Sequence, residues 1–292
     1  MSLYSACRLC ARKCEVDRTR GEIGFCRSSD RMKITRAALH FWEEPIISGE
    51  CGSGTVFFSG CSLGCVYCQN ARISRSSVGD EYTPETLAQQ LLRLQEEGAH
   101  NINFVTPTHF APSIVKTVKL ARASGLTVPI VYNTGSYDTV DTVRMLDGLV
   151  DVYLPDLKYY RNETAKRLSY AEDYPSVARL AIAEMMRQRP MPVIERGIMR
   201  SGVIARILLL PSHVAEAKLS VKYLYETYGN SIYISLMNQY TPMPGMKSPL
   251  NRTVTNAEYS ELVRYAEKIG VVNAFVQEGG TQSESFIPEF NV

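Results

Sequence analysis

Three cysteines stand close together in the chain, at Cys61, Cys65 and Cys68. Thiolates at this C-x3-C-x2-C spacing can each bind one iron of a 4Fe–4S cluster, which leaves the fourth iron without a protein ligand. An iron with an open position can chelate a small molecule and pass it an electron. Structural zinc usually takes four ligands, and buried apolar cysteines need no such spacing, so both alternatives are disfavoured. Gly60 and Gly64 let the backbone wrap tightly around a cluster, which supports the iron–sulfur interpretation.

The spacing resembles the signature of the radical S-adenosylmethionine (SAM) superfamily. The resemblance implies that SAM occupies the open iron, and that an electron from the cluster splits SAM into methionine and a 5′-deoxyadenosyl radical. In such chemistry the cofactors carry the reaction and the protein orients them. The resemblance also implies that Tyr67, the aromatic residue before the last cysteine, lies near the adenine of SAM.

The composition agrees with a soluble enzyme in a reducing compartment. With 292 residues, of which 45% are hydrophobic and 21% charged, the chain can bury a large core. It shows no apolar run of membrane-spanning length and no signal peptide. All eight cysteines lie between Cys7 and Cys68, and such grouping indicates metal binding rather than disulfides. We expect a cytoplasmic protein that binds neither a membrane nor nucleic acid, since a nucleic-acid module should be more basic than a net charge of +2.

The cysteines also divide the chain into two parts. Residues 1–50 are predicted to form a cysteine-rich metal or iron–sulfur segment, and residues 51–292 a barrel domain. After Cys68, apolar strands alternate with helices, which indicates an α/β fold with a parallel sheet covered by helices. The sheet should curl, and the resemblance implies the superfamily's partial (β/α)6 TIM-like barrel. We expect strands over residues 101–106, 128–132, 149–154, 203–210, 232–237 and 271–276, and helices over 84–97, 111–124, from about 138, 163–188, 213–228 and 257–268.

Polar residues gather where the expected strands end. In barrels of this kind, function lies at the C-terminal ends of the strands. SAM offers an ammonium group, a carboxylate and ribose hydroxyls, all of which need polar partners. The residues predicted to bind it, at these ends and in the cysteine loop, are Tyr67, Asn70, Thr106, Thr108, Asn133, Thr134, Ser136, Asp156, Lys158, Arg206 and Gln239.

Some strand ends can be compared with relatives more closely. The Asp-Leu-Lys run that begins at Asp156 resembles the matching strand end of glycyl-radical-enzyme activases, such as the pyruvate formate-lyase activating enzyme. In those enzymes the Asp shapes the SAM end of the pocket, partly through a monovalent cation. Asn133 and Thr134 stand where the activases have Asp-Thr, so we expect that cation to be weaker or absent. Members of the superfamily often carry a Gly-Gly-Glu-like run near the SAM amino group. This chain has Thr-Pro-Thr there, starting at Thr106, and therefore no carboxylate. Backbone carbonyls or Thr hydroxyls are left to bind the SAM amino group.

Two residues have open alternatives. Arg206 lies within an apolar strand, and an unpaired buried charge is costly, so its partner is either a SAM or substrate carboxylate or a structural Asp or Glu. His109 is the candidate catalytic residue, as a substrate contact or proton donor beside the pocket. The alternative for His109 is a hydrogen-bonded structural histidine.

The N-terminal segment carries four more thiols, at Cys7, Cys10, Cys14 and Cys26. From residue 1 to residue 36 there are nine Lys or Arg and four Asp or Glu, and this positive excess can offset the charge of a four-thiolate site. The site could hold zinc or a second 4Fe–4S cluster. The C-x2-C-x3-C run resembles ferredoxin spacing more than paired zinc knuckles, which favours iron. Cys51 is isolated and is interpreted as a small apolar or loop residue.

Longer runs, among them Arg-Gly-Glu-Ile-Gly-Phe-Cys ending at Cys26 and His-Phe-Trp-Glu-Glu-Pro starting at His40, resemble one branch of the radical SAM superfamily. That branch is related by similarity to the pyruvate formate-lyase activating enzyme. The resemblance implies hydrogen abstraction, activation of a glycyl radical enzyme, and a flavodoxin- or ferredoxin-type electron donor. The alternatives are another peptide or small-molecule substrate, or a non-catalytic iron–sulfur carrier or zinc-binding module. A carrier would need neither an open iron nor a polar barrel mouth.

Overall fold

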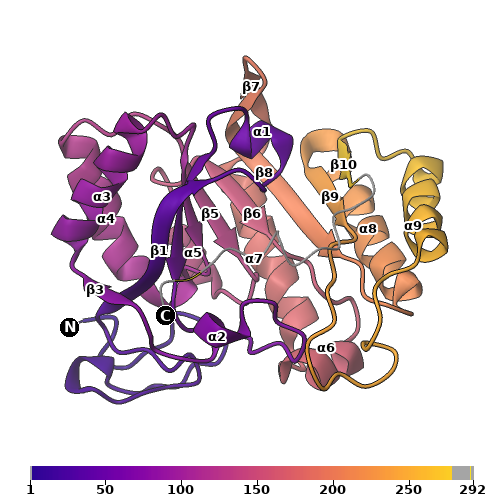
Figure 1. Ribbon diagram of the computed structural model, residues 1–292, viewed down its shortest axis with the longest axis horizontal. Coiled ribbons are helices and arrows are strands. Elements are labelled where there is room, and N and C mark those ends of the chain that lie inside the picture. Colours follow the sequence, from indigo (N-terminus) through magenta and orange to yellow (C-terminus); the bar gives the residue numbers. More distant parts are fainter. Residues whose placement is uncertain (1, 278–289, 291–292) are drawn as a thin grey trace.

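Ten strands form one curved sheet in the computed structural model, which describes residues 2–277 and residue 290 (Figure 1). The strand order is β10-β9-β8-β6-β5-β4-β2-β1-β3, and β7 (Val193–Glu195) is attached to β8. In the described residues β10 and β3, at the two ends of this order, are not paired with each other, so the sheet is a partial barrel. Its parallel strands are β2 (Ser53–Phe58), β4 (Ile102–Val105), β5 (Ile130–Thr134), β6 (Val152–Pro155), β8 (Ile198–Leu208), β9 (Tyr233–Met237) and β10 (Ala274–Val276).

Helices connect the parallel strands and cover the outside of the sheet (Figure 1). Parallel strands need such crossovers, because no short turn can join them. The α/β fold predicted from the alternation of strands and helices is therefore confirmed. The connecting helices are α3 (Pro84–Glu96), α4 (Ala111–Ala123), α5 (Val140–Arg144), α6 (Asn162–Ser169), α7 (Tyr174–Gln188), α8 (Val214–Tyr228) and α9 (Asn256–Ile269).

Hydrophobic side chains fill the space between the sheet and the helices. Leu91 of α3 and Ile182 of α7 are completely buried in this main core. A second, smaller cluster lies around Ile47 of the short helix α1 (Pro45–Ser48), which packs against Val131 and Val152. Both valines stand near the beginning of their strands. Helix α1 therefore closes the barrel at the amino-terminal ends of the parallel strands.

One predicted helix start is confirmed and one predicted helix is wrong. Thr83 caps α3 by accepting a hydrogen bond from the Thr86 backbone, and Pro84 occupies the first turn. The single helix predicted over residues 163–188 is two helices, α6 and α7. Tyr170 ends α6 in the left-handed conformation (φ 52°), and Pro175 stands in the first turn of α7. Left-handed helix ends usually carry glycine, so a tyrosine there gives no sequence signal.

The N-terminal side adds a strand that was not expected. β1 (Met32–His40) pairs antiparallel with β2, and the short β3 (Asp80–Tyr82) pairs with β1. Residues 2–31 are mostly loops, with one 3-10 turn (η1, Arg18–Arg20), and lie at the carboxyl end of the barrel strands, at the lower left of Figure 1. The predicted boundary near residue 50 stays a prediction, although β1 joins the barrel sheet across it. Residues 278–289 and 291–292 of the predicted barrel domain lie outside the described residues.

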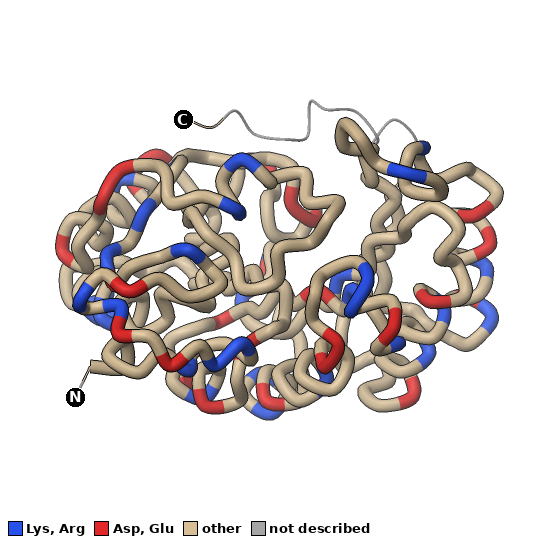
Figure 2. The backbone as a smooth tube through the Cα atoms, turned by 90° about the horizontal axis from the view of Figure 1, so that it is seen from below, with Lys and Arg blue, Asp and Glu red and all other residues tan. Residues whose placement is uncertain are grey.

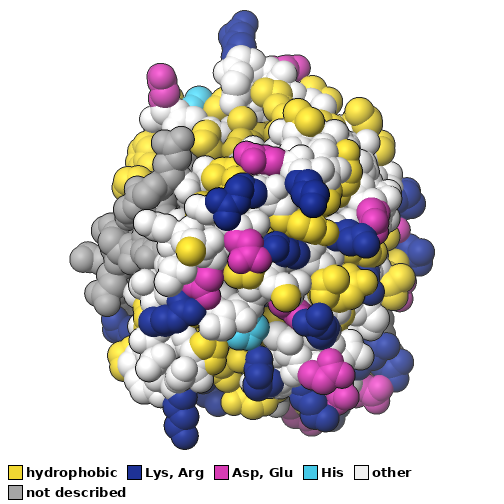
Figure 3. Space-filling model, turned by 90° about the vertical axis from the view of Figure 1, so that its right-hand side faces the viewer, with side chains coloured by type: hydrophobic (Ala, Val, Ile, Leu, Met, Phe, Trp, Pro, Cys, Tyr) yellow, Lys and Arg dark blue, Asp and Glu magenta, His cyan; other side chains and the backbone are white. Residues whose placement is uncertain are grey.

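The surface mixes charges of both signs. Acidic and basic residues are interspersed around the backbone in Figure 2 and over the α8–α9 face in Figure 3. That face therefore carries no broad field of one sign. Among residues 2–277 and 290, no helix combines the length and the apolar character needed to cross a membrane.

Candidate active site

The open end of the barrel contains a cavity of about 580 Å³. Its wall combines inner faces of the strands with the cysteine loop, residues 59–70, which follows β2. Residues far apart in the sequence therefore line one cavity at the strand ends, which is where barrels of this kind carry their functional sites. Their binding of SAM stays a prediction. The predicted residues that line the cavity are Cys61, Cys65, Tyr67, Cys68, Asn70, Thr106, Thr108, Asn133, Asp156, Lys158, Arg206 and Gln239.

Two predicted SAM-binding residues do not line this cavity. The Thr134 hydroxyl donates to Asp138 (2.6 Å between oxygens) and accepts from the backbone N–H of Ser136 (3.1 Å). The side chains of Thr134 and Ser136, the two residues in question, are buried. Successive strand residues point to opposite faces, so Asn133 faces the cavity whereas Thr134 faces away from it. In this structure Thr134 and Ser136 shape the turn after β5.

Two glycines shape the cysteine loop. Gly60 (φ 86°) and Gly64 (φ 66°) both adopt the left-handed conformation. A Cβ atom on Gly60 would stand 2.5 Å from the carbonyl oxygen of Cys26, and one on Gly64 would stand 3.2 Å from the Phe25 ring. The loop therefore lies directly against the N-terminal segment, and a side chain at Gly60 would separate the two.

Two thiols of the cysteine loop, those of Cys61 and Cys68, are shifted toward the protonated form by their surroundings. Burial, followed by the neighbouring thiols of Cys65 and Cys68, raises the pKa of Cys61 to about 12. Burial also raises the pKa of Cys68. Metal binding at these residues must therefore release protons.

The loop fits a cluster better than a single ion. In the described part of the chain, no group of three or more His, Cys, Asp or Glu side chains is spaced to hold one metal ion. A 4Fe–4S cluster binds each thiolate through a different iron, so its thiolates surround a larger body. Three free thiols on the wall of a cavity of about 580 Å³ suit that arrangement.

Asp156 and Lys158 form an ion pair on the cavity wall, with 2.5 Å between Lys158 Nζ and Asp156 Oδ2. Their side chains are only 23% and 17% exposed, so this is not an ordinary surface pair. Burial alone would lower the pKa of Lys158, but the Asp156 carboxylate beside it raises that pKa well above its usual range. The pair therefore presents a fixed anion and a fixed cation to a zwitterionic ligand.

Arg206 is paired with structural acids, which was one of its two predicted alternatives. Its guanidinium donates to both carboxylate oxygens of Glu44, at 2.9 and 2.8 Å, and also to Glu43. Burial would raise the pKa of Glu44, but Arg206 outweighs it and the pKa is lowered, so Glu44 is ionised. Sequence reasoning missed both glutamates as site residues. The signal was available, because Arg206 demanded an acidic partner and a Glu-Glu pair precedes the barrel.

His109 has the geometry of the second of its two predicted alternatives, a hydrogen-bonded structural histidine, and it does not line the cavity. Its Nε2 lies 2.8 Å from the carbonyl oxygen of Ser59, and its side chain is buried outside the cavity wall. The 3-10 turn η2 (Thr108–Phe110) directs the imidazole behind the cysteine loop. Burial, helped by the charge of Arg18, lowers the pKa of His109 to about 3, so the ring is neutral at physiological pH.

The N-terminal thiols do not line this cavity. Cys7, Cys10 and Cys26 are buried, and Cys14 is exposed. Burial, followed by smaller contributions from the other thiols, raises the pKa of Cys10 to about 12. The Arg18 guanidinium lies 3.6 Å from Cys7 Sγ. A metal at these four cysteines stays a prediction.

Arg12 connects the two cysteine regions. Its guanidinium donates to the carbonyl oxygens of Ser62 and Leu63 in the cysteine loop, at 2.9 and 3.1 Å. It also donates to the carbonyls of Ser169 (3.0 Å) and Tyr170 (2.5 Å), at the end of α6. In addition, it stacks over the Phe25 ring at 3.8 Å. One side chain thus holds the N-terminal segment, the cysteine loop and α6 together.

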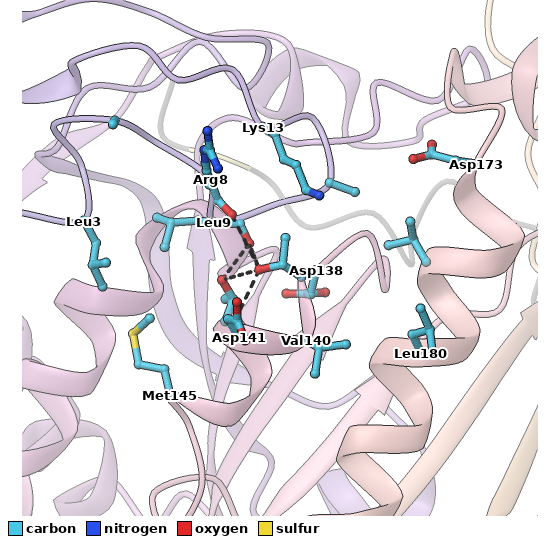
Figure 4. Close-up of a pocket in the computed structure, with 15 residues that line it drawn as sticks. Leu3, Arg8, Leu9, Lys13, Asp138, Val140, Asp141, Met145, Asp173 and Leu180 are labelled. Carbon is cyan, nitrogen blue, oxygen red and sulfur yellow. Dashed lines mark hydrogen bonds between the residues drawn. The ribbon is translucent and has the colours of Figure 1, made fainter.

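A second hollow, of about 550 Å³, lies outside the barrel where the N-terminal segment meets α5 and α7 (Figure 4). Leu9, Met145 and Leu180 give it an apolar lining, with Arg8 among the charged residues around them. The carbonyl of Leu9 accepts from the Thr142 hydroxyl at 2.7 Å, which fixes the segment to α5. The hollow includes none of the cysteines.

Comparison with known families decides which group the chain belongs to. A model described as the radical SAM superfamily matches residues 55–213, more than half of the chain. This chain belongs to the radical SAM superfamily. Within it, the chain is 30% identical over 282 residues to "Uncharacterized protein MJ0674" of Methanocaldococcus jannaschii, covering 91% of this chain and 76% of that protein.

Several solved structures share the architecture. A radical SAM methyltransferase from Sphaerobacter thermophilus superposes with a TM-score of 0.54 at 16% identity, over 78% of this chain and 67% of that one. For anSMEcpe with bound AdoMet the TM-score is 0.54 at 15% identity, over 72% and 57%. For SuiB of Streptococcus suis bound to the precursor peptide SuiA it is 0.51 at 10% identity, over 76% and 47%. At these identities the likeness shows the fold alone.

Proposed function

We propose that this radical SAM enzyme cleaves SAM reductively and abstracts a hydrogen atom from a peptidyl substrate. A glycine in a partner glycyl radical enzyme is the specific substrate we favour. The observation that carries the proposal is the single cavity shared by the thiols of Cys61, Cys65 and Cys68 and by the polar strand ends. A non-catalytic carrier would have no use for such a cavity beside its thiols.

The residues of the cavity have distinct roles in this proposal. The three cysteines hold the 4Fe–4S cluster, and Asp156 and Lys158 bind the polar end of SAM. When bound, the cluster and SAM supply a 5′-deoxyadenosyl radical that removes a hydrogen atom from the substrate. Arg206, already neutralised by Glu43 and Glu44, holds the inner wall in place. The apolar strand residues around these groups exclude water from the reacting centre.

A peptidyl substrate is supported by two kinds of similarity. The Asp-Leu-Lys run at Asp156 resembles the glycyl-radical activases. Among proteins of similar fold, anSMEcpe has been solved with the Kp18Cys peptide and SuiB with a precursor peptide. We further propose a cytoplasmic enzyme that receives its electron from a flavodoxin- or ferredoxin-type donor. Cys7, Cys10, Cys14 and Cys26 would hold a second 4Fe–4S cluster or zinc, and the cluster is favoured because no group of three or more His, Cys, Asp or Glu side chains in the described residues is spaced for a single ion.

Isotope transfer tests the proposal directly. The anaerobically reconstituted protein is mixed with SAM, dithionite and a glycyl radical enzyme from the same source that is deuterated at glycine. We expect deuterium in the 5′-deoxyadenosine and a glycyl signal in electron paramagnetic resonance. SAM cleavage without either result would remove the activase function and retain the radical SAM activity. No cleavage with an intact, reduced cluster would overturn both.

A further inference from the structure

A row of buried hydroxyl groups leads from the cavity wall to one thiol of the cysteine loop. The Tyr67 and Tyr159 hydroxyl oxygens are 2.7 Å apart, and the Tyr159 oxygen is 2.6 Å from Ser169 Oγ. Ser169 Oγ donates to Cys65 Sγ at 2.9 Å. All four residues are buried, with exposed fractions from 0 to 7%. The row brings together three parts of the chain: the cysteine loop, the segment after β6 and the last residue of α6.

The number of hydroxyl protons in this row determines which group donates each hydrogen bond. A thiolate that ligates iron can only accept hydrogen bonds, so the proton of Ser169 must point to Cys65. Ser169 has no second proton, so the neighbouring hydroxyl of Tyr159 must donate to it. By the same reasoning Tyr67 must donate to Tyr159. The three O–H dipoles are therefore aligned toward the thiolate, and aligned hydrogen bonds strengthen one another.

The other two thiols of the loop have weaker partners. Cys61 Sγ accepts from the backbone N–H of Leu63 at 3.4 Å, and Cys68 Sγ lies 3.3 Å from Ser74 Oγ. Both distances are longer than the 2.9 Å between Ser169 Oγ and Cys65 Sγ. Cys65 is thus the thiol whose environment most strongly favours extra negative charge.

We propose that the Tyr67–Tyr159–Ser169 chain raises the reduction potential of the cluster held by Cys61, Cys65 and Cys68. Accepting an electron makes the cluster more negative, and hydrogen bonds donated to its sulfurs stabilise that state. Ser169 acts on the thiolate directly, and the two tyrosines are positioning residues that act through it. This inference concerns the cluster and not the substrate. The failure of hydrogen abstraction from any one substrate would leave it intact.

The test is a redox titration of full-length protein, reconstituted anaerobically with iron and sulfide, with neither SAM nor substrate present. Dithionite supplies the electrons, and the paramagnetic resonance signal that disappears in a Cys61→Ala, Cys65→Ala, Cys68→Ala variant identifies the relevant cluster. We compare Ser169→Ala, Tyr159→Phe and Tyr67→Phe with the unmodified chain. The matched controls are Tyr153→Phe, a buried tyrosine bonded to Gln188 instead, and Ser220→Ala, a buried serine of α8.

We expect Ser169→Ala to make reduction about tenfold less favourable, which for one electron is about 59 mV to more negative potential. Tyr159→Phe should shift the potential less and Tyr67→Phe least, in the same direction. Ser169→Thr, which keeps the hydroxyl, should restore the potential. The proposal would be overturned if Ser169→Ala and the unmodified chain, both with intact clusters, had the same reduction potential. It would also be overturned if the control variants shifted the potential equally. If Ser169→Ala assembles no cluster, the comparison of Tyr159→Phe with Tyr153→Phe decides.

Discussion

The two cysteine regions of this chain share a residue type and nearly share a spacing, yet the fold uses them differently. The thiols of Cys61, Cys65 and Cys68 line a cavity that can admit a second molecule. Cys7, Cys10 and Cys26 are buried, and with exposed Cys14 they line neither of the two hollows described above. The comparison teaches that a cysteine motif becomes a reactive site through the space its thiols face. Spacing alone does not separate an open site from a closed one.

Removing the thiols of the cysteine loop gives the largest expected effect. A Cys61→Ala, Cys65→Ala, Cys68→Ala variant should lose SAM cleavage completely, because no ligands remain for the cluster. The production of 5′-deoxyadenosine by the pure, reconstituted protein measures this. The converse variant, with Cys7, Cys10, Cys14 and Cys26 changed to Ser, should still cleave SAM if it folds. Normal SAM cleavage by the variant that lacks Cys61, Cys65 and Cys68 would contradict the assignment of the catalytic cluster to the cysteine loop.

The same triple variant also tests whether the N-terminal cysteines bind a metal of their own. It should retain one metal site at the N-terminal cysteines, since their segment is folded by contacts of its own, such as the Leu9 carbonyl to Thr142. Elemental analysis of the purified protein distinguishes iron from zinc. A correctly folded but metal-free variant would show that these four thiols are structural.

Arg12→Ala should destabilise the contact between the two cysteine regions. The side chain makes four hydrogen bonds to carbonyls, and losing charged hydrogen bonds at a partly buried site should cost about 3 kcal/mol of unfolding free energy. Denaturant unfolding measures this cost. Arg8→Ala is the control, because that side chain is 65% exposed and its salt bridge to Glu15 is worth about 0–1 kcal/mol. Equal losses would mean that Arg12 joins nothing of consequence.

Asp156→Asn tests whether the cavity binds SAM through its fixed charges. Loss of one charged hydrogen bond, roughly 1.5–3 kcal/mol, should weaken SAM affinity about tenfold to a hundredfold. Cluster content, measured as iron per chain, should not change. Asp141→Asn, on a side chain that is 91% exposed, is the control for charge alone. Unchanged SAM affinity would place Asp156 outside the binding contacts.

The smallest expected effect is a pH dependence centred on His109, which lies between the two regions. Arg18 of the N-terminal segment donates to the His109 carbonyl, and the His109 ring contacts Ser59, the first residue of the cysteine loop. The folded pKa of about 3 is below the usual unfolded value of about 6.5. Neutral His109 therefore contributes stability that is fully present above pH ~6.5 and is lost as the pH falls toward 3.

Urea unfolding between pH 7 and about pH 5.5 measures this dependence. The total loss over this range should be at most about 1.4 kcal/mol, because only about one pH unit of it lies below the usual pKa. His109→Gln should flatten this part of the profile, whereas His213→Gln at the start of α8 should not. An identical acid slope in the chain with and without His109 would show that the ring does not control it.

Much of the fold could be predicted from local patterns. Alternating apolar and polar stretches gave the strands and helices of the barrel, and Thr83 with Pro84 gave the start of α3, because these signals are contained in a few adjacent residues. The break at Tyr170 and the strand β1 were missed. A left-handed tyrosine has no composition signature, and the burial of β1 depends on pairing with β2 and β3 rather than on its own alternation.

The site was predictable only where position along a strand decides the outcome. Asp156 and Asn133 line the cavity because they end strands. Contacts between distant segments were not foreseeable as pairs: Arg206 with Glu44 is a separation of 162 residues, and Ser169 with Cys65 one of 104. His109 shows the limit of the strand-end rule, since one 3-10 turn sends its ring behind the loop instead of into the cavity.

The four acceptors of Arg12 also impose an order in time. The ribosome makes the N-terminal cysteines first, but the Tyr170 carbonyl that Arg12 binds comes 158 residues later. At about 5–20 residues per second, that interval is roughly 8–32 s of synthesis. During it, the segment that carries Cys7, Cys10, Cys14 and Cys26 lacks its contacts with the end of α6, so its thiols are less well held than in the folded protein. We therefore predict that the metal proposed for these four cysteines is loaded most readily into the nascent chain, before Arg12 joins the segment to α6.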